Sequence, residues 1–267
     1  MGPEIAEVAY MYCIIGSGQP KSFGALGIGG RGDELFSVCA DGLCAVVSRC
    51  PMQQFKMSRD NLLAHERAIE EVMKTHTVLP VRFATVAESA EKVQPILLKE
   101  AERFSSLLRE MEGRKELGLK AIFNSEKIYA QIVEQDGEIR KTRARLAALP
   151  AEKSYFQRME LGRLVEKALE HERDKYRDEI LSVLSPLAIE VKIAKPYGEM
   201  MILSAAFLVE HTREEEVDHS VHGLDERFGD LMTWRYTGTL PPFNFVNLTI
   251  NTEELSCFCS IIFYLRR

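Results

Sequence analysis

The sequence has little of what several large classes of protein require. It contains a single tryptophan, Trp234, so a platform for stacking nucleic-acid bases would depend on phenylalanine and tyrosine. The 34 lysines and arginines do not outnumber the 40 aspartates and glutamates, and the net charge of −6 gives no overall basic surface for nucleic acid. The longest apolar run, residues 255–265, is far shorter than the roughly 20 residues of a membrane span. We therefore expect a soluble protein that binds neither nucleic acid nor membrane.

Cysteine is also sparse and forms no recognisable metal or disulfide pattern. The six cysteines are at positions 13, 39, 44, 50, 257 and 259, and most lie in apolar, strand-like runs where a free thiol behaves as a small hydrophobic side chain. Cys257 and Cys259 have one residue between them and no second pair downstream, which argues against zinc. The first eight residues lack the apolar core of a signal peptide. These features predict an intracellular, reducing compartment.

The order of predicted elements repeats once along the chain. The first half reads strand, glycine-rich loop, hairpin, helix and strand, and the second reads strand, helices, hairpin, helix and strand. Both halves match a βαββαβ plan, in which the first helix is replaced by a loop in one half and enlarged in the other. We predict an α+β protein of two modified ferredoxin-like domains with added helices, which lie on one face of each mainly antiparallel sheet. The expected domains are residues 1–113 and 114–250, followed by an apolar tail, 251–267.

Several local signals support this division. Asp41 and Gly42 separate two β-type runs and predict a tight hairpin, because both turn positions tolerate a positive φ. Ser58 is the expected N-cap of a helix that extends to residue 76. A helical break is expected at Asp136 and Gly137, and a strand at residues 77–83.

No arrangement of residues predicts catalysis. The run of glycines at residues 27–32 lacks the preceding strand and following helix of a dinucleotide fingerprint, so we interpret it as a flexible surface loop. Glu215, His219 and His222 share one helical edge, a spacing that more often arises by chance than in a metal site. No Gly-x-Ser-x-Gly elbow is present, and no cysteine has a base beside it in the sequence. The sequence thus favours a binding or structural protein without cofactor or metal over an enzyme.

His65, Glu66 and Arg82 are predicted to be structural. His65 lies near the apolar stripe of its helix, and residue 69 is isoleucine, so the two-histidine face of a zinc protease is absent. A hydrogen-bonded, half-buried histidine is the expected role. Because the helix and the strand at residues 77–83 are consecutive, they should pack together and bring Arg82 within reach of a carboxylate.

Two segments that contain proline are candidates for a partner surface. Proline within the strand at residues 77–83 marks an edge or a bulge, and the run at 237–246 follows the equivalent strand of the second half. A rigid turn that packs the chain end is the alternative for the second run. The residues predicted to contact a partner are Leu79, Pro80, Phe83, Pro242, Phe243 and Phe245.

These segments resemble the gas vesicle protein F/L family. The run LAHER at residues 63–67, followed by TVLPVRFAT at 77–85, resembles the family signature, and PPFNF at 241–245 matches in order. The strand at 9–15 and the runs at 41–48, 116–120 and 205–209 fit as well, so the resemblance covers about residues 8–248. Ala84 stands where the family usually has glycine, and Thr239 and Leu240 replace a Pro-Trp pair.

The resemblance implies a cytoplasmic accessory protein of gas vesicle assembly, without enzymatic activity or cofactor. Family members are two-domain α+β proteins thought to contact the small hydrophobic shell protein and other accessory proteins, and to limit aggregation of the shell protein during nucleation. The alternative is a nucleotide- or small-molecule-binding regulatory protein on the same ferredoxin-like halves. The apolar tail is expected to fold back onto the body of the protein.

Overall fold

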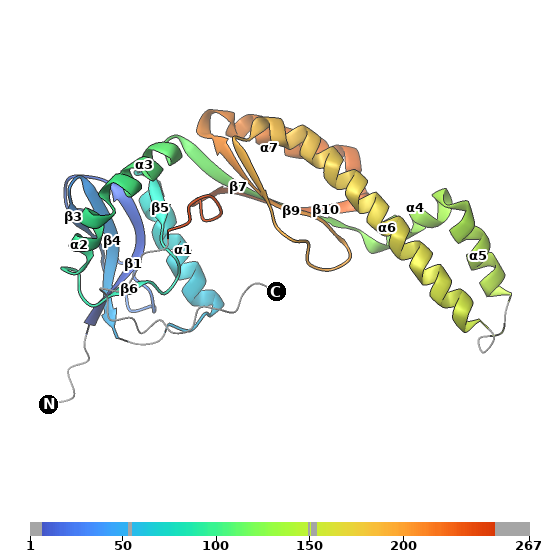
Figure 1. Cartoon of the computed structure of the whole chain (residues 1–267), viewed down its shortest axis with the longest axis horizontal. Coiled ribbons are helices and arrows are strands. Elements are labelled where there is room, and N and C mark those ends of the chain that lie inside the picture. The colour runs from blue at the N-terminus through green and yellow to red at the C-terminus, as the bar shows by residue number, and fades with distance from the viewer. Residues whose placement is uncertain (1–6, 53–54, 149, 151–153, 249–267) are drawn as a thin grey trace. The chain divides into compact units, whose positions relative to one another are not determined.

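The computed structural model describes residues 7–52, 55–148, 150 and 154–248, which form two compact units of mixed helix and sheet (Figure 1). The first unit comprises residues up to Lys115 together with the segment that begins at Leu240, and the second is Glu116–Thr239. The last described residues, 240–248, thus belong with the first unit, whereas the sequence analysis placed them in the second domain. The tail at 251–267 lies outside the described residues.

The first unit is built on a six-stranded sheet. Its strand order is β2-β3-β4-β1-β5, and β6 pairs with β1 beyond this path. Its strands are β1 (Glu7–Gly16), β2 (Ser22–Gly24), β3 (Leu35–Ala40), β4 (Leu43–Pro51), β5 (Val78–Pro80) and β6 (Val86–Ala87). Its helices are α1 (Arg59–Met73), α2 (Val93–Lys99) and α3 (Ala101–Met111).

Helices cover both faces of this sheet, which corrects the expectation of a single covered face. Strand β1 is buried at every position between its two ends, so both of its faces need a cover. Helix α1 packs on β1 and β5 and contributes Ala68, Ile69 and Val72 to one core cluster. Helix α3, whose Phe104 is buried, packs on β1, β4 and β5 but adds no residue to that cluster. The central strand therefore lies between two helical layers.

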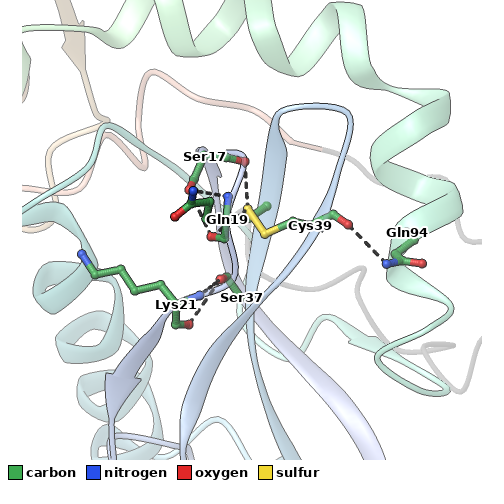
Figure 2. Close-up of a disulfide and its surroundings, with 7 residues drawn as sticks. Ser17, Gln19, Lys21, Ser37, Cys39 and Gln94 are labelled. Atoms are coloured by element: carbon green, nitrogen blue, oxygen red, sulfur yellow. Dashed lines mark hydrogen bonds between the residues drawn. A yellow bond between two sulfur atoms is a disulfide. The ribbon is translucent and has the colours of Figure 1, made fainter.

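The predicted hairpin is present and carries a cross-link that the sequence analysis did not predict. Asp41 has a φ of 50° and Gly42 a φ of 75°, as a two-residue hairpin turn requires. Cys39 and Cys44 are directly opposite each other on β3 and β4 and form a disulfide (Figure 2). The expectation of free thiols fails here because the turn places the two cysteines as cross-strand neighbours. Cys13 and Cys50 are free and buried.

The second unit is a four-stranded sheet with strand order β10-β7-β9-β8. The first strand therefore lies between the last and the third, and β5-β1-β4-β3 repeats this arrangement in the first unit. Its strands are β7 (Arg114–Phe123), β8 (Glu190–Ile193), β9 (Met201–Glu210) and β10 (Met232–Leu240). Its helices are α4 (Ser125–Gln135), α5 (Gly137–Ala147), α6 (Tyr155–Leu184) and α7 (Glu214–Phe228), with short 3-10 helices at Ser185–Leu187, His211–Arg213 and Gly229–Leu231.

Local chemistry explains where these helices begin. Asp136 separates α4 from α5, as predicted, because its carboxylate accepts hydrogen bonds from the backbone amides of Glu138 and Ile139. Ser58 caps α1 in the same way through the amide of Asn61. One core cluster joins the helices to the sheet, with Leu119, Phe207 and Ile180 among its buried residues. Among the helices of the described residues, none combines the length and apolar composition that a membrane crossing needs.

Candidate functional site

Segments that the sequence analysis singled out meet around His65 in the first unit. His65 is 3% exposed, and its Nε2 lies 3.1 Å from the carbonyl oxygen of Val81. Its Nδ1 lies 3.1 Å from the hydroxyl of Tyr10, a residue of β1. That hydroxyl also accepts a 2.9 Å hydrogen bond from the backbone amide of Ala84. One imidazole thus connects α1, β1 and the chain after β5.

The hydrogen bonds define the protonation of this network. Because Val81 offers only a carbonyl acceptor, His65 donates from Nε2 and accepts the Tyr10 hydroxyl proton at Nδ1. Burial lowers the pKa of His65 to about 4, and burial raises the pKa of Tyr10 above its ordinary value. Both side chains are therefore neutral at pH 7. The histidine is more deeply buried than the half-buried position that its sequence spacing suggested.

Aromatic rings surround the imidazole. The ring of Tyr12 stacks on His65 with centroids 5.6 Å apart, and Phe83 meets it edge-on at 5.8 Å. Phe243, from the end of the described chain, lies 6.3 Å away. The hydroxyl of Tyr12 is satisfied by Ser48 and by the backbone amide of Ile28. The contact of both tyrosines with the histidine was not predicted from the sequence, because β1 and α1 are far apart along the chain.

The chain between β5 and β6 bends sharply beside this network. The predicted strand at 77–83 ends at Pro80, although the amide of Val81 still donates to the carbonyl of Tyr12. Ala84 has a φ of 64°, in the left-handed region that favours glycine. Thr85 holds the bend through a 2.7 Å bond from its hydroxyl to the carbonyl of Arg82. The bend presents the Ala84 amide to Tyr10.

The segment at residues 241–248 returns to the first unit and is held there by two arginines. Arg82 donates to the side-chain oxygen of Asn247 at 2.9 Å, and Arg103 donates to its backbone oxygen at 3.2 Å. Val246 and Leu248 are buried on either side of Asn247. The prediction of a carboxylate partner for Arg82 is therefore corrected, because among the described residues its partner is the amide of a residue 165 positions later.

Glu66 follows His65 on α1 but has no part in the histidine network. It is half-buried, and burial, together with the neighbouring charge of Glu70, raises the pKa of its carboxyl. Arg82 is exposed and extends toward Asn247. The three predicted structural residues therefore have three different surroundings.

The residues predicted to contact a partner divide by exposure. Leu79 and Pro80 are buried because they pair with Ile14 and Cys13 of β1. Pro242 is buried too, so these three are not available to a partner in this conformation.

The other three predicted contact residues remain accessible. Phe243 is 39% exposed, and Phe83 and Phe245 are partly exposed. Two more exposed apolar side chains, Met57 and Leu62, belong to α1 and the residues just before it. Leu62 precedes His65 by one helical turn.

The glycine run at residues 27–32 and helix α7, which carries His219 and His222, make local structural contacts. Gly27 donates to the carbonyl of Asp33 at 2.8 Å, and a Cβ on Gly27 would lie 2.6 Å from the Asp33 Cβ, so this glycine allows a tight loop closure. Ile28 is buried, so the loop is anchored rather than flexible along its length. On α7, His222 pairs with Glu226. The described residues include no group of three or more His, Cys, Asp or Glu that could hold a metal ion.

Comparison with known proteins agrees with the motif pattern. The family model described as gas vesicle synthesis protein GvpL/GvpF matches residues 8–247. Gas vesicle protein F of Dolichospermum flosaquae is 25% identical over 242 residues, which are 90% of this chain and 97% of that protein. The crystal structure of GvpF from Anabaena sp. PCC7120 aligns with a TM-score of 0.78 at 24% identity, over 91% of this chain and 99% of that chain. GvpF from Microcystis aeruginosa gives a TM-score of 0.73 at 25% identity, over 90% and 99%.

Proposed function

The chain belongs to the GvpL/GvpF family of gas vesicle synthesis proteins, and we propose that it is a non-enzymatic, cytoplasmic accessory protein that binds the hydrophobic gas vesicle shell protein. In this role it limits aggregation of the shell protein before assembly, and it acts beside other accessory proteins of the vesicle. The ferredoxin-like interpretation of the two units is part of the proposal. It is supported by the shared strand order, in which the first strand lies between the last and the third.

The observation that carries the proposal is the position of Phe243. Its ring is 39% exposed, although its neighbours Pro242 and Val246 are buried and Asn247 is held by two arginines. An aromatic side chain on a fixed backbone loses little conformational entropy when a partner covers it. Phe243 therefore suits the contact with an apolar client.

The surroundings of Phe243 support a rigid apolar surface. The imidazole of His65 lies behind its ring, and the hydrogen bonds of that imidazole connect α1 to β1. Phe83 contacts the same imidazole and is partly exposed. Together with Phe245, Leu62 and Met57, these side chains are the contact surface that we propose.

A surface of this kind would act on the shell protein by mass action. A shell subunit in water must cover an apolar face, and a partner that binds this face lowers the concentration of free subunit. Because aggregation depends steeply on the free concentration, a modest affinity is sufficient. No chemical step is required of the accessory protein.

The test is co-expression of tagged protein with the shell protein, followed by pull-down and light scattering of the shell protein. Wild type should retain the shell protein and reduce its scattering. Phe243→Ala and Met57→Ala should weaken both effects while circular dichroism shows an unchanged fold. Tyr197→Ala, which removes a side chain that is 89% exposed in the second unit, is the matched control and should behave as wild type.

The possible outcomes test separately whether the shell protein is the partner and whether the contact surface is the one proposed. If wild type neither retains the shell protein nor reduces its scattering, the partner is wrong. If wild type retains it and the Phe243 and Met57 variants retain it equally, the contact lies elsewhere on the chain.

A further inference from the structure

A basic cluster lies on α5 in the second unit, within a protein whose net charge is negative. Helix α5 carries Arg140, Lys141, Arg143 and Arg145 against a single acid, Glu138. All four basic side chains are exposed. Within the part of the chain that the structure describes, none of the four pairs with a carboxylate, and Arg140 donates only to a backbone carbonyl, at 3.4 Å.

The first turns of α6 present three large apolar side chains to solvent. Tyr155 is 64% exposed, Phe156 is 79% exposed and Met159 is 56% exposed. The rings of Tyr155 and Phe156 meet edge to face with centroids 5.6 Å apart. Met159 follows Tyr155 by four residues and Phe156 by three, so it neighbours both on the helix surface. Exposed aromatic side chains grouped in this way are typical of interaction sites.

The fold brings the basic and the apolar side chains to the same end of the helical layer. Helices α5 and α6 pack against each other, and only residues 148–154 separate the end of α5 from the start of α6 (Figure 1). Arg143 and Arg145 lie near the end of α5, and Arg158 is in the first turn of α6. We name Arg143, Arg145, Tyr155, Phe156, Arg158 and Met159 the α5–α6 tip.

We propose that the α5–α6 tip is a docking surface for an acidic amphipathic helix of a partner protein. Arginine, tyrosine, phenylalanine and methionine are the residue types enriched at the centres of protein interfaces. The aromatic rings of α6 would cover the apolar face of the partner helix, and the guanidinium groups would pair with carboxylates along its edges. This surface belongs to the second unit and is separate from the surface proposed for the shell protein.

The extent of the apolar patch favours a protein partner over an anionic lipid surface. A helix that lies in a membrane interface needs an apolar face along its whole length. On α6 the large exposed apolar side chains are confined to Tyr155, Phe156 and Met159, and the described residues include none further along this helix. The patch matches two or three anchor residues of a docked helix.

The probe is a fluorescein-labelled synthetic peptide of about 18 residues, or five helical turns. It has leucine on one face and glutamate on the other, and its matched peptide has lysine in place of every glutamate. Anisotropy with the full-length chain gives the affinities. The test variants are Arg143→Glu/Arg145→Glu and Phe156→Ser. The controls are Lys195→Glu/Arg235→Glu, with the same change in net charge on exposed residues of the second unit, and Tyr197→Ser.

We expect the acidic peptide to bind wild type and the lysine peptide not to bind. Both test variants should weaken binding roughly tenfold, and both controls should stay within about twofold of wild type. Equal weakening in the charge-matched control, or no binding of the acidic peptide, would overturn the proposal. The last measurement is binding to vesicles of phosphatidylcholine and phosphatidylglycerol. If the test variants abolish vesicle binding but leave peptide binding unchanged, the tip binds lipid instead of a protein helix.

Discussion

The hydroxyl of Tyr10 lies 3.1 Å from Nδ1 of His65 and links the central strand of the first unit to its covering helix. The same hydroxyl accepts from the amide of Ala84, so the tyrosine uses both of its hydrogen-bonding capacities in a buried position. Each of the three partners comes from a different segment. The network therefore forms only when α1, β1 and the bend after β5 are correctly packed together.

Tyr10→Phe should destabilise the first unit by about 1–3 kcal/mol, because it leaves the Ala84 amide and the His65 Nδ1 without their buried partner. Urea unfolding followed by circular dichroism measures the change, and hydrogen exchange of β1 peptides assigns it to the first unit. Tyr129→Phe is the control, since its ring is 36% exposed on α4. A Tyr10→Phe protein within about 0.5 kcal/mol of wild type would contradict the importance of this bond.

The stability of the first unit should decrease as the pH is lowered, because the pKa of His65 is lower in the folded state than in the unfolded chain. Its folded-state pKa of about 4 lies below the ordinary value of 6.5, so the unfolded chain binds the proton first as the pH falls. The contribution is fully present above pH 6.5 and is lost between pH 6.5 and 4, by about 3 kcal/mol in total. The unfolding free energies of wild type and His65→Gln should be measured across this pH range. Carboxylates titrate in both proteins, so the difference between the two isolates the contribution of His65. The difference between the two proteins should shrink as the pH falls; a constant difference would contradict the prediction.

Ala84→Gly should stabilise the protein slightly. A φ of 64° costs a residue with a Cβ about 1–2 kcal/mol, and glycine removes this strain. Glycine also has a larger entropy in the unfolded chain, which offsets part of the stabilisation. The expected net gain is up to about 1 kcal/mol. Ala144→Gly, on the exposed side of α5, is the control and should lose about 1 kcal/mol. Thermal unfolding distinguishes the two signs, and a loss at position 84 would show that the bend does not strain alanine.

Arg82→Ala should have a modest effect, because the side chain is exposed and its partner is a neutral amide. We expect a loss of about 0.5–1.5 kcal/mol, and a similar loss for Arg103→Ala. The double variant should release the segment at 241–248, which hydrogen exchange of peptides that span Val246 would detect. Arg235→Ala, an exposed position of β10, should leave that exchange unchanged. A loss above about 3 kcal/mol for Arg82→Ala alone would indicate a buried ion pair instead.

Reduction of the Cys39–Cys44 disulfide should lower stability by at most about 2 kcal/mol, because it closes a loop of only a few residues. The turn at Asp41 and Gly42 already holds the hairpin together, so the measured effect should fall below this bound. Dithiothreitol should lower the melting temperature of wild type and leave Cys39→Ala/Cys44→Ala unchanged. If both proteins respond equally, the reductant acts at another site.

Short stretches of the sequence are enough to predict the main local structure and the family of this protein. The hairpin follows from Asp41 and Gly42, and the start of α5 follows from Asp136, because turn and cap preferences depend on a few adjacent residues. The motif series was sufficient to identify the family, and periodicity predicted the order of the main strands and helices. The short strands β2 and β6 were not predicted, since β2 lies in the segment expected to be a glycine-rich loop. Each of these patterns involves only neighbouring residues, so it can be recognised in a single sequence without knowledge of the fold.

Contacts between residues far apart in the chain become visible only in the folded protein. Tyr10 and His65 are 55 positions apart, and Arg82 and Asn247 are 165 apart, so no local pattern could predict either pair. The burial of Leu79 and Pro80, which removed them from the partner surface, depends on pairing with β1. The disulfide also required the strand register, which brings Cys39 and Cys44 face to face. Such contacts arise when packing brings separate segments together, and packing depends on the whole chain.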